Sequence, residues 1–161
     1  MGDFDFVKSA MDQIGIKRLF WKIAQKPGKP LTFGIRGNHL YFGLPGNPVS
    51  ALVCFYLYVW PTLRRMAGFE RIFLPTVEVT MGETIKKAKG LTEFIRCKLT
   101  QRANGREAQL TGTQSSGALS SLSLGDSLVI GNADKEVLAK GTKAMAIILD
   151  REEFMRSVPP F

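Results

Sequence analysis

The chain has 161 residues, of which 45% are hydrophobic and 22% are charged, and its formal net charge is +8. This balance is typical of a folded globular protein and excludes a disordered chain. The longest apolar run, residues 51–60, has ten residues, well short of the roughly 20 that span a membrane. His39 is the single histidine, and Cys54 and Cys97 lack partners at zinc-ligand spacing. We therefore expect neither a multi-histidine nor a zinc site.

Positive charge is concentrated in the first part of the chain. Residues 1–68 hold nine lysines and arginines against three acidic residues, whereas the remainder holds thirteen against eleven. A basic surface indicates nucleic acid, an acidic membrane surface or a phosphorylated small molecule as the partner. The aromatic residues of 55–60 lie in a helix-forming run, so we do not expect a base-stacking surface for nucleic acid. Lys86, Lys87 and Lys89 are expected to be exposed loop charges.

The chain opens with a predicted helix, strand and loop. Val7 to Ile14 has apolar residues at the i, i+3, i+4, i+7 spacing of an amphipathic helix, which Gly15 can end. Leu19 to Ala24 predicts a buried strand. Lys26 to Pro30 contains two prolines and predicts an extended loop whose lysines can point into a site.

The next elements are a hairpin and a long helix. Leu31–Arg36 and His39–Leu44 predict two strands that flank a tight turn at Gly37-Asn38. Residues 49–67 predict a helix that Gly68 ends. These elements make about half of an α/β layer, because too few strands are present to cover both helices.

The stretch Gly43-Leu44-Pro45-Gly46-Asn47-Pro48-Val49-Ser50 joins the hairpin to the long helix. Asn47 predicts a helix N-cap, and Pro48 suits the first helical position. The amides and the positive dipole end of a helix N-terminus favour a phosphate or another oxyanion. We interpret this corner as a candidate anion-binding site, with a strand-to-helix turn that binds nothing as the alternative.

Beyond residue 69 the sequence predicts the short strands of a small antiparallel barrel or sandwich. Val77, Val79 and Met81 alternate with polar residues, and Asn104-Gly105 predicts a two-residue hairpin turn. Further strands are expected at 93–102, 107–111, 128–130 and 143–149, and a short helix or loop is expected at 118–124. We therefore expect two domains, residues 1–69 and 70–161.

Residues 43–51, Gly-Leu-Pro-Gly-Asn-Pro-Val-Ser-Ala, resemble the signature of the molybdopterin molybdenumtransferases, a family that includes bacterial MoeA and the gephyrin E domain. Gly2 to Lys8, Phe20-Trp21-Lys22 and Lys26 to Pro30 resemble further family segments, in the family's order. Two later segments, Phe94-Ile95-Arg96 and Gln114-Ser115-Ser116-Gly117, resemble less specific motifs of the family's C-terminal barrel. The resemblance implies an α/β fold, a partial MogA-like pterin-binding layer, followed by a small all-β barrel.

The resemblance also implies a reaction late in molybdenum-cofactor biosynthesis. Relatives insert molybdenum from molybdate into adenylylated molybdopterin, with a Mg²⁺-dependent release of AMP. Two oxyanionic substrates must therefore share one cleft. Family members are homodimers, so a second copy or companion subunit is an expected partner. A cytoplasmic location without a membrane is expected, since no secretion signal opens the chain and the lone cysteines fit a reducing compartment.

Individual residues match positions that the family uses. Asp5, Lys22 and Lys26 match catalytic positions, with both lysines near molybdate and phosphate groups. Asp5 also suits a Mg²⁺ ligand, and Asp3 is a weaker metal candidate whose alternative role is helix capping. For Lys26 the alternative is a solvated loop lysine. The substrate-binding residues implied by the resemblance are Pro45, Gly46, Asn47, Pro48, Ser50 and Ser116, the last with a turn hydroxyl as its alternative.

Part of the family pattern has no counterpart in this sequence. The Gly-Gly-Val-Ser turn, a Thr-Gly-Asp-Glu type segment and two N-terminal domains of the relatives are absent. We expect a fragment, a start-site artefact or one piece of a split protein, with activity that depends on the absent domains. Two alternative functions remain: a non-enzymatic scaffold module of the gephyrin type, which an apolar groove on the barrel would favour, and a basic barrel that binds RNA.

Overall fold

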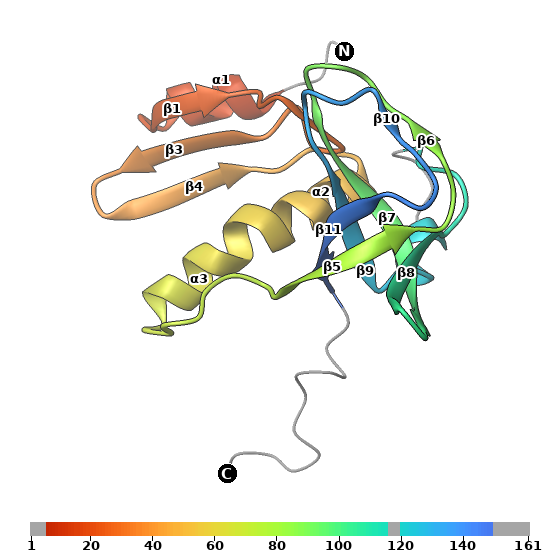
Figure 1. Cartoon of the computed structure of the whole chain (residues 1–161). Coiled ribbons are helices and arrows are strands. Elements are labelled where there is room, and N and C mark those ends of the chain that lie inside the picture. Colours follow the sequence, from red (N-terminus) through yellow and green to blue (C-terminus); the bar gives the residue numbers. More distant parts are fainter. Residues whose placement is uncertain (1–5, 116–119, 150–161) are drawn as a thin grey trace. The chain divides into compact units, whose positions relative to one another are not determined.

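The computed structural model describes residues 6–115 and 120–149. The chain divides into two compact units, Met1–Ile72 and Phe73–Phe161, and each is described by itself (Figure 1). Among the described residues, no helix combines the length and the apolar character needed to cross a bilayer.

Unit 1 contains a three-stranded antiparallel sheet in the order β1-β3-β4. Helix α1 spans Phe6–Gln13. The strands are β1 (Lys17–Trp21), β3 (Thr32–Arg36) and β4 (His39–Gly43), and a short strand, β2, covers Gln25–Lys26. The predicted hairpin is confirmed, because Arg36 pairs with His39 across Gly37, whose φ is 55°.

Helix α1 covers the face of this sheet that carries its small residues. A Cβ added at Gly34 would lie 2.6 Å from the Ile16 side chain and 3.0 Å from that of Met11, and one added at Gly43 would lie 2.5 Å from Val7. Glycine at these two positions therefore lets the helix approach the strands closely. Figure 1 shows the long helix on the other side of the sheet.

The prediction of a buried strand over Leu19 to Ala24 is wrong in two respects. The strand ends at Trp21, where Lys22 takes a positive φ of 68°. Leu19 and Phe20 are 49% and 38% exposed. Leu19 lies at a shift of register between Arg18 and Phe20, so it has no partner residue on β3, and β1 is an edge strand among the described residues.

The long helix is continuous but not uniform. It consists of α2 (Pro48–Cys54), a π-helical segment η1 (Phe55–Val59) and α3 (Trp60–Met66). The amide of Trp60 donates to the carbonyl of Phe55, five residues earlier. This wider turn leaves room for the ring of Pro61, which would crowd the preceding carbonyl of a regular helix.

The predicted end of the long helix at Gly68 is confirmed. Gly68 has a φ of +81°. Its amide donates to the carbonyl of Arg65 at 3.1 Å, and the Phe69 amide donates to that of Arg64 at 3.0 Å. This pair of bonds satisfies carbonyls that the helix leaves open, as in a Schellman motif.

Unit 2 is a closed five-stranded barrel. Its strands are β5 (Thr76–Met81), β7 (Thr92–Arg102), β8 (Gly105–Leu110), β9 (Ser127–Gly131) and β11 (Lys143–Ile148). They follow the order β7-β8-β5-β11-β9, and β9 pairs back with β7. A two-stranded ribbon of β6 (Ile85–Lys86) and β10 (Val137–Leu138) and the short helix α4 (Ser120–Ser123) complete the unit.

The sequence left open whether unit 2 is a barrel or a sandwich, and the structure shows a barrel. This barrel is not wholly antiparallel. Strands β5 and β8 run parallel, and the other four pairings are antiparallel. Strand directions cannot alternate around a closed ring with an odd number of strands, so one parallel pair is unavoidable. The predicted turn at Asn104-Gly105 is also displaced by one residue: Arg102 pairs with Gly105, and Gly105, with a φ of 115°, is the first residue of β8.

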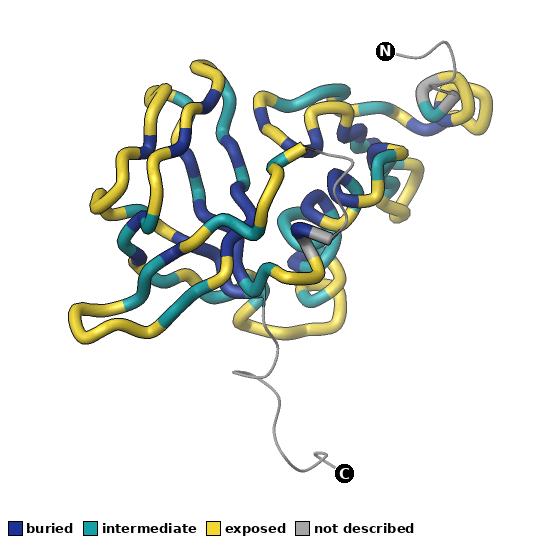
Figure 2. Tube along the Cα trace, turned by 90° about the vertical axis from the view of Figure 1, so that its right-hand side faces the viewer, coloured by how far each residue is buried: buried dark blue, intermediate teal, exposed yellow. Residues whose placement is uncertain are grey.

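Alternating side chains of the barrel strands fill its interior. The core cluster includes Val79, Met81, Ile95, Cys97 and Val129, all 2% exposed or less. Figure 2 shows buried positions recurring along these strands, whereas the loops between strands are exposed.

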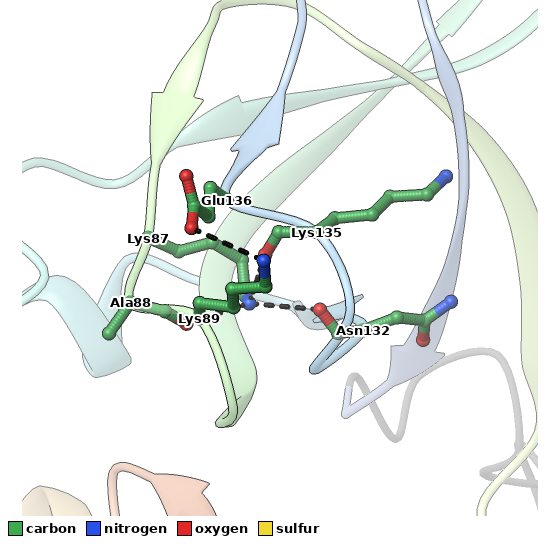
Figure 3. A network of polar contacts seen from close by, with 6 residues as sticks. All are labelled: Lys87, Ala88, Lys89, Asn132, Lys135 and Glu136. Carbon is green, nitrogen blue, oxygen red and sulfur yellow. Dashed lines mark hydrogen bonds and ion pairs between the residues drawn. The ribbon is translucent and has the colours of Figure 1, made fainter.

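Lys87 departs from the predicted exposed loop charge, since it is only 8% exposed. Its ammonium donates to three backbone carbonyls, those of Ala88 at 3.0 Å, Asn132 at 2.9 Å and Lys135 at 2.6 Å (Figure 3). Lys89 agrees with the prediction, as its side chain is 72% exposed and lies 4.0 Å from Glu136. A buried ammonium is stable only with such partners, so Lys87 joins the segment after β6 to the segment between β9 and β10.

Each unit contains one buried free cysteine, which confirms the prediction of small buried thiols. Burial raises the pKa of Cys54 from 9.0 to about 12. Burial, aided by the carboxylates of Glu83 and Asp126, raises the pKa of Cys97 to about 12. Because the thiolate is the reactive form, we expect both thiols at pH 8 to react at least roughly 100-fold more slowly in the native chain than in urea.

The same shifts predict how stability depends on pH. Above pH 9 the unfolded thiols lose protons that the folded thiols keep, so raising the pH toward 12 lowers the free energy of unfolding.

The rate at which each thiol reacts is measured by labelling with a chromogenic disulfide. Cys97→Ala leaves Cys54 as the labelled thiol, and Cys54→Ala leaves Cys97. Rapid labelling in native buffer would contradict the burial of that cysteine.

Candidate functional site

The corner between β4 and α2 has the predicted cap. Asn47 is extended, with φ −75° and ψ 125°, and its side-chain oxygen accepts from the amides of Val49 at 3.1 Å and Ser50 at 3.3 Å. Pro48 is the first residue of α2. The predictions of Asn47 as N-cap and Pro48 at the first helical position are therefore confirmed.

This capping corrects the expectation that the helix amides are offered to an anion. Pro48 has no amide proton, Val49 and Ser50 donate to the Asn47 side chain, and Ala51 donates to the Asn47 carbonyl at 2.9 Å. The first-turn donors already have partners within the chain. Donors for a ligand must instead come from the residues before the helix.

Gly46 lies in that preceding segment and has no structural need to be glycine. It is exposed, its φ is outside the left-handed region, and an added Cβ would meet nothing within 4 Å. Among residues 6–115 and 120–149, no group accepts a hydrogen bond from the amide of Gly46 or Asn47. Because glycine has no Cβ, a ligand can approach the backbone closely at this position.

The neighbouring residues of the corner divide into buried and exposed. Pro45 and Ser50 are buried, so they shape the corner from inside, whereas Pro48 is exposed.

Lys22 follows directly on the end of β1. It is the one non-glycine residue with a positive φ in the described ranges, at 68°. Its ammonium lies 3.8 Å from the centroid of the Trp21 ring. A left-handed lysine is strained by about 1 kcal/mol, and such outliers cluster at functional sites.

The pairing of the sheet brings Lys22 and the corner to the same end. Trp21 pairs with Thr32, and Thr32 pairs with Gly43, so the three residues form one row across β1, β3 and β4. Strands β1 and β4 run in the same direction, since both are antiparallel to β3. Two strand spacings, about 10 Å, therefore separate the points where Lys22 and Leu44 leave the sheet.

The loop that carries Lys26 lies against the long helix. The thiol of Cys54 donates to the Gly28 carbonyl at 3.7 Å, and the buried Gln25 donates to Cys54 at 3.7 Å. Lys26 itself is exposed. The structure therefore gathers Lys22, the Lys26 loop and the 43–50 corner at one end of unit 1.

In unit 2, sequence reasoning did not assign Arg96 to a site, although the resemblance included it. Arg96 is 1% exposed; its guanidinium donates to the Ser121 hydroxyl at 2.7 Å and to the carbonyls of Thr113 at 3.2 Å and Ser115 at 3.0 Å. Gln114 in turn accepts from the Arg96 amide at 2.9 Å. Arg96 thus orders the segment 113–115. The sequence signal for this role was an arginine between two apolar residues of β7, Ile95 and Cys97.

Comparison with known proteins agrees with this two-part organisation. The family description "Probable molybdopterin binding domain" matches residues 1–65, and "MoeA C-terminal region (domain IV)" matches residues 78–149. The molybdopterin molybdenumtransferase of Haemophilus influenzae is 41% identical over 120 residues, which are 72% of this chain and 29% of that protein. Gephyrin of Dictyostelium discoideum is 33% identical, over 92% of this chain and 24% of its own length.

The chain belongs to the molybdopterin molybdenumtransferase family. A crystal structure of a molybdopterin biosynthesis MoeA protein from Pyrococcus horikosii has the same fold, with a TM-score of 0.73 and 27% identity over 91% of this chain and 35% of that one. This membership places the chain in molybdenum-cofactor biosynthesis. It spans about a quarter of the length of the curated relatives that it matches.

Three residues expected from the family lie outside the described ranges, namely Asp3, Asp5 and Ser116. Among the described residues, no three His, Cys, Asp or Glu side chains gather as a metal cluster, and the two candidate Mg²⁺ ligands, Asp3 and Asp5, lie outside that part of the chain. In unit 1, Asp12 instead pairs with Arg18 at 3.3 Å. We therefore derive no step through a metal ion.

Proposed function

We propose that this chain acts in the insertion of molybdenum from molybdate into adenylylated molybdopterin, with release of AMP, as a molybdopterin molybdenumtransferase. Unit 1 would hold the oxyanions at the end of the sheet where the corner and both lysines lie. The parts of the relatives that this chain does not span would supply the remaining contacts of the reaction.

The observation that carries the proposal is the shared end of the sheet. The row Trp21–Thr32–Gly43 directs Lys22 and the 43–50 corner to one side of unit 1. Lysine ammonium groups are compact point charges that suit a tetrahedral oxyanion such as molybdate. The amides of Gly46 and Asn47 add donors that can orient it.

In this proposal the chain's own residues bind and orient. Lys22 and Lys26 would neutralise the charge of molybdate and of the phosphate groups, while the open backbone at Gly46 would let an oxygen approach closely. Magnesium stays an expectation from the family, since Asp3 and Asp5 are not among the described residues.

The function is tested by titrating the full chain with three ligands: molybdate, adenylylated molybdopterin and single-stranded RNA. We expect both small molecules to bind and RNA not to bind. The enzymatic proposal would be contradicted if neither molybdate nor adenylylated molybdopterin bound, even after the N-terminal part of a relative is added in trans.

A charge-matched set of variants tests the site itself. We expect Lys22→Ala and Lys26→Ala each to weaken molybdate binding roughly 10-fold or more, the effect of losing one charge-assisted hydrogen bond. Lys17→Ala removes the same charge at the opposite end of β1, where Lys17 pairs with Ile35, and is expected to change binding less than about 2-fold because solvent screens distant charges.

Isothermal titration calorimetry with molybdate, supported by circular dichroism of each variant, makes this measurement. Equal weakening by all three substitutions would show a diffuse charge effect. Unchanged binding in both Lys22→Ala and Lys26→Ala would move the site elsewhere.

The second candidate function is a non-enzymatic binding module of the gephyrin type. A cavity of about 280 Å³ on the barrel unit favours it. Half of its lining is apolar, from Ile130, Leu138, Ala144 and Met145, and the other half is polar or charged, from Glu78, Asn132, Lys135 and Lys143, of which Lys143 and Glu78 form an ion pair at 3.0 Å. A cavity with both apolar and charged walls suits a partner side chain that has an apolar body and a polar end, and the absence of small-molecule binding in the titration would favour this candidate.

A further inference from the structure

Gln25 is a buried amide beside a proposed oxyanion-binding lysine. It is 3% exposed. Its side-chain nitrogen donates to the Pro27 carbonyl at 2.8 Å and to Cys54 at 3.7 Å, and its oxygen accepts from the Tyr58 hydroxyl at 2.5 Å. Both ends of this amide therefore have partners, as a buried polar group requires.

The bond from Gln25 to Pro27 closes a ring around Lys26. The side chain of residue 25 holds the carbonyl of residue 27, so the backbone of Lys26 is held on both sides. The loop is also tied across its base, where the amide of Ile23 donates to the Lys29 carbonyl at 3.0 Å and that of Leu31 donates to the Gly28 carbonyl at 3.1 Å.

Tyr58 connects this ring to the long helix at its irregular segment. It lies in the π-helical residues Phe55–Val59. Each residue of an α-helix turns the direction of the side chains by about 100°, so the wider turn changes the direction of the residues that follow. Burial is the main cause that raises the pKa of Tyr58, and the nearby Cys54 adds to the effect. The Tyr58 hydroxyl therefore keeps the proton that it donates to Gln25.

We propose that Gln25 and Tyr58 are positioning residues, which hold the backbone of Lys26 so that its ammonium is aimed at the bound oxyanion. This inference rests on the proposed function of unit 1. Without the Tyr58 hydroxyl, the Gln25 amide loses the acceptor contact that orients it, and the ring around Lys26 loosens. The ordering of Lys26 then has to be supplied by the ligand on binding, which weakens affinity.

Tyr58→Phe in the full chain tests the proposal, with Tyr56→Phe as the matched control. Tyr56 lies two residues earlier in the same segment, and its hydroxyl has no hydrogen bond to a described residue. Two quantities are measured: hydrogen exchange of the Ile23 and Leu31 amides in the ligand-free chain, and molybdate affinity by calorimetry. Thermal melting of each variant checks the fold.

We expect Tyr58→Phe to speed exchange of both amides and to weaken molybdate binding about 3- to 10-fold, the equivalent of one hydrogen bond. In a Lys26→Ala background the same change should leave affinity unaltered, because a positioning residue acts only through the residue that it positions. Tyr56→Phe should change neither quantity. A merely structural role would weaken binding equally in both backgrounds.

The outcomes separate this inference from the function on which it rests. Unchanged exchange in Tyr58→Phe overturns the positioning role, whatever the affinity. Faster exchange with full molybdate affinity, or an equal loss in both backgrounds, also overturns it. If the unaltered chain binds no molybdate, the proposed function fails, while faster exchange in Tyr58→Phe would still show that the pair orders the loop.

Discussion

Lys87→Met is expected to lower the free energy of unfolding of the barrel unit by about 3 kcal/mol, the cost of leaving buried polar groups without partners. Methionine keeps the apolar stem but leaves the carbonyls of Ala88, Asn132 and Lys135 without their donor. The stem itself is closely packed, since an added Cβ at Gly131 would lie 3.0 Å from it.

Lys89→Met is the matched control for this change. The Lys89 side chain is 72% exposed and is 4.0 Å from Glu136, and an exposed ion pair contributes less than about 1 kcal/mol. Both tryptophans lie in unit 1, so barrel stability is best followed by denaturant-dependent labelling of Cys97 in a Cys54→Ala background. Equal labelling midpoints for Lys87→Met and Lys89→Met would contradict the buried role of Lys87.

Gly28→Ala is expected to destabilise unit 1 by roughly 3 kcal/mol, through backbone strain and overpacking together. Gly28 has a φ of +105°, and an added Cβ would lie 2.5 Å from both the Cys54 sulfur and the Gln25 side-chain nitrogen. The neighbouring atoms belong to the buried contact between the lysine loop and the long helix, so they have little room to move.

Gly46→Ala is the matched control, because it adds the same methyl group where neither backbone strain nor overpacking is expected. Its φ is not in the left-handed region and its added Cβ meets nothing within 4 Å. We expect a stability change of less than about 0.5 kcal/mol, but weaker molybdate binding. Urea unfolding followed by tryptophan fluorescence compares the two variants. Similar midpoints would contradict the packing at Gly28, and full molybdate affinity in Gly46→Ala would remove Gly46 from the site.

Local features of the fold could be predicted because their interactions close within a few residues. The Asn47 side chain bonds to amides two and three residues away, and the end of the helix at Gly68 uses carbonyls three and five residues back. Residue type and spacing carry all the information that such motifs need. The hairpin at Gly37-Asn38 was predictable for the same reason.

The arrangement of the barrel could not be predicted in the same way. Alternation located most strands, but the parallel pairing of β5 with β8 and the closure of β9 on β7 depend on residues far apart in the chain. The parallel pair follows only from closing five strands into a ring. The turn at Asn104-Gly105 was displaced because pairing between whole strands, and not the dipeptide alone, sets the register.

The candidate site was also predicted only in part from the sequence. The resemblance named Lys22, Lys26 and the 43–50 corner, but the helix amides expected to bind an anion are already used by the Asn47 cap. The roles proposed for Gln25 and Tyr58 have no sequence signal, because the two residues are 33 positions apart and meet only through the loop and the π-helical turn.

The sequence by itself determined the family, the order of an α/β part and a β part, and the ends of the long helix, because motifs and caps are encoded by neighbouring residues. Only the tertiary structure decided that Lys87 and Arg96 are buried, and that Lys22 and the corner leave the sheet at one end. A charged side chain is exposed by default, and its burial depends on carbonyls and hydroxyls that distant segments supply when the chain folds.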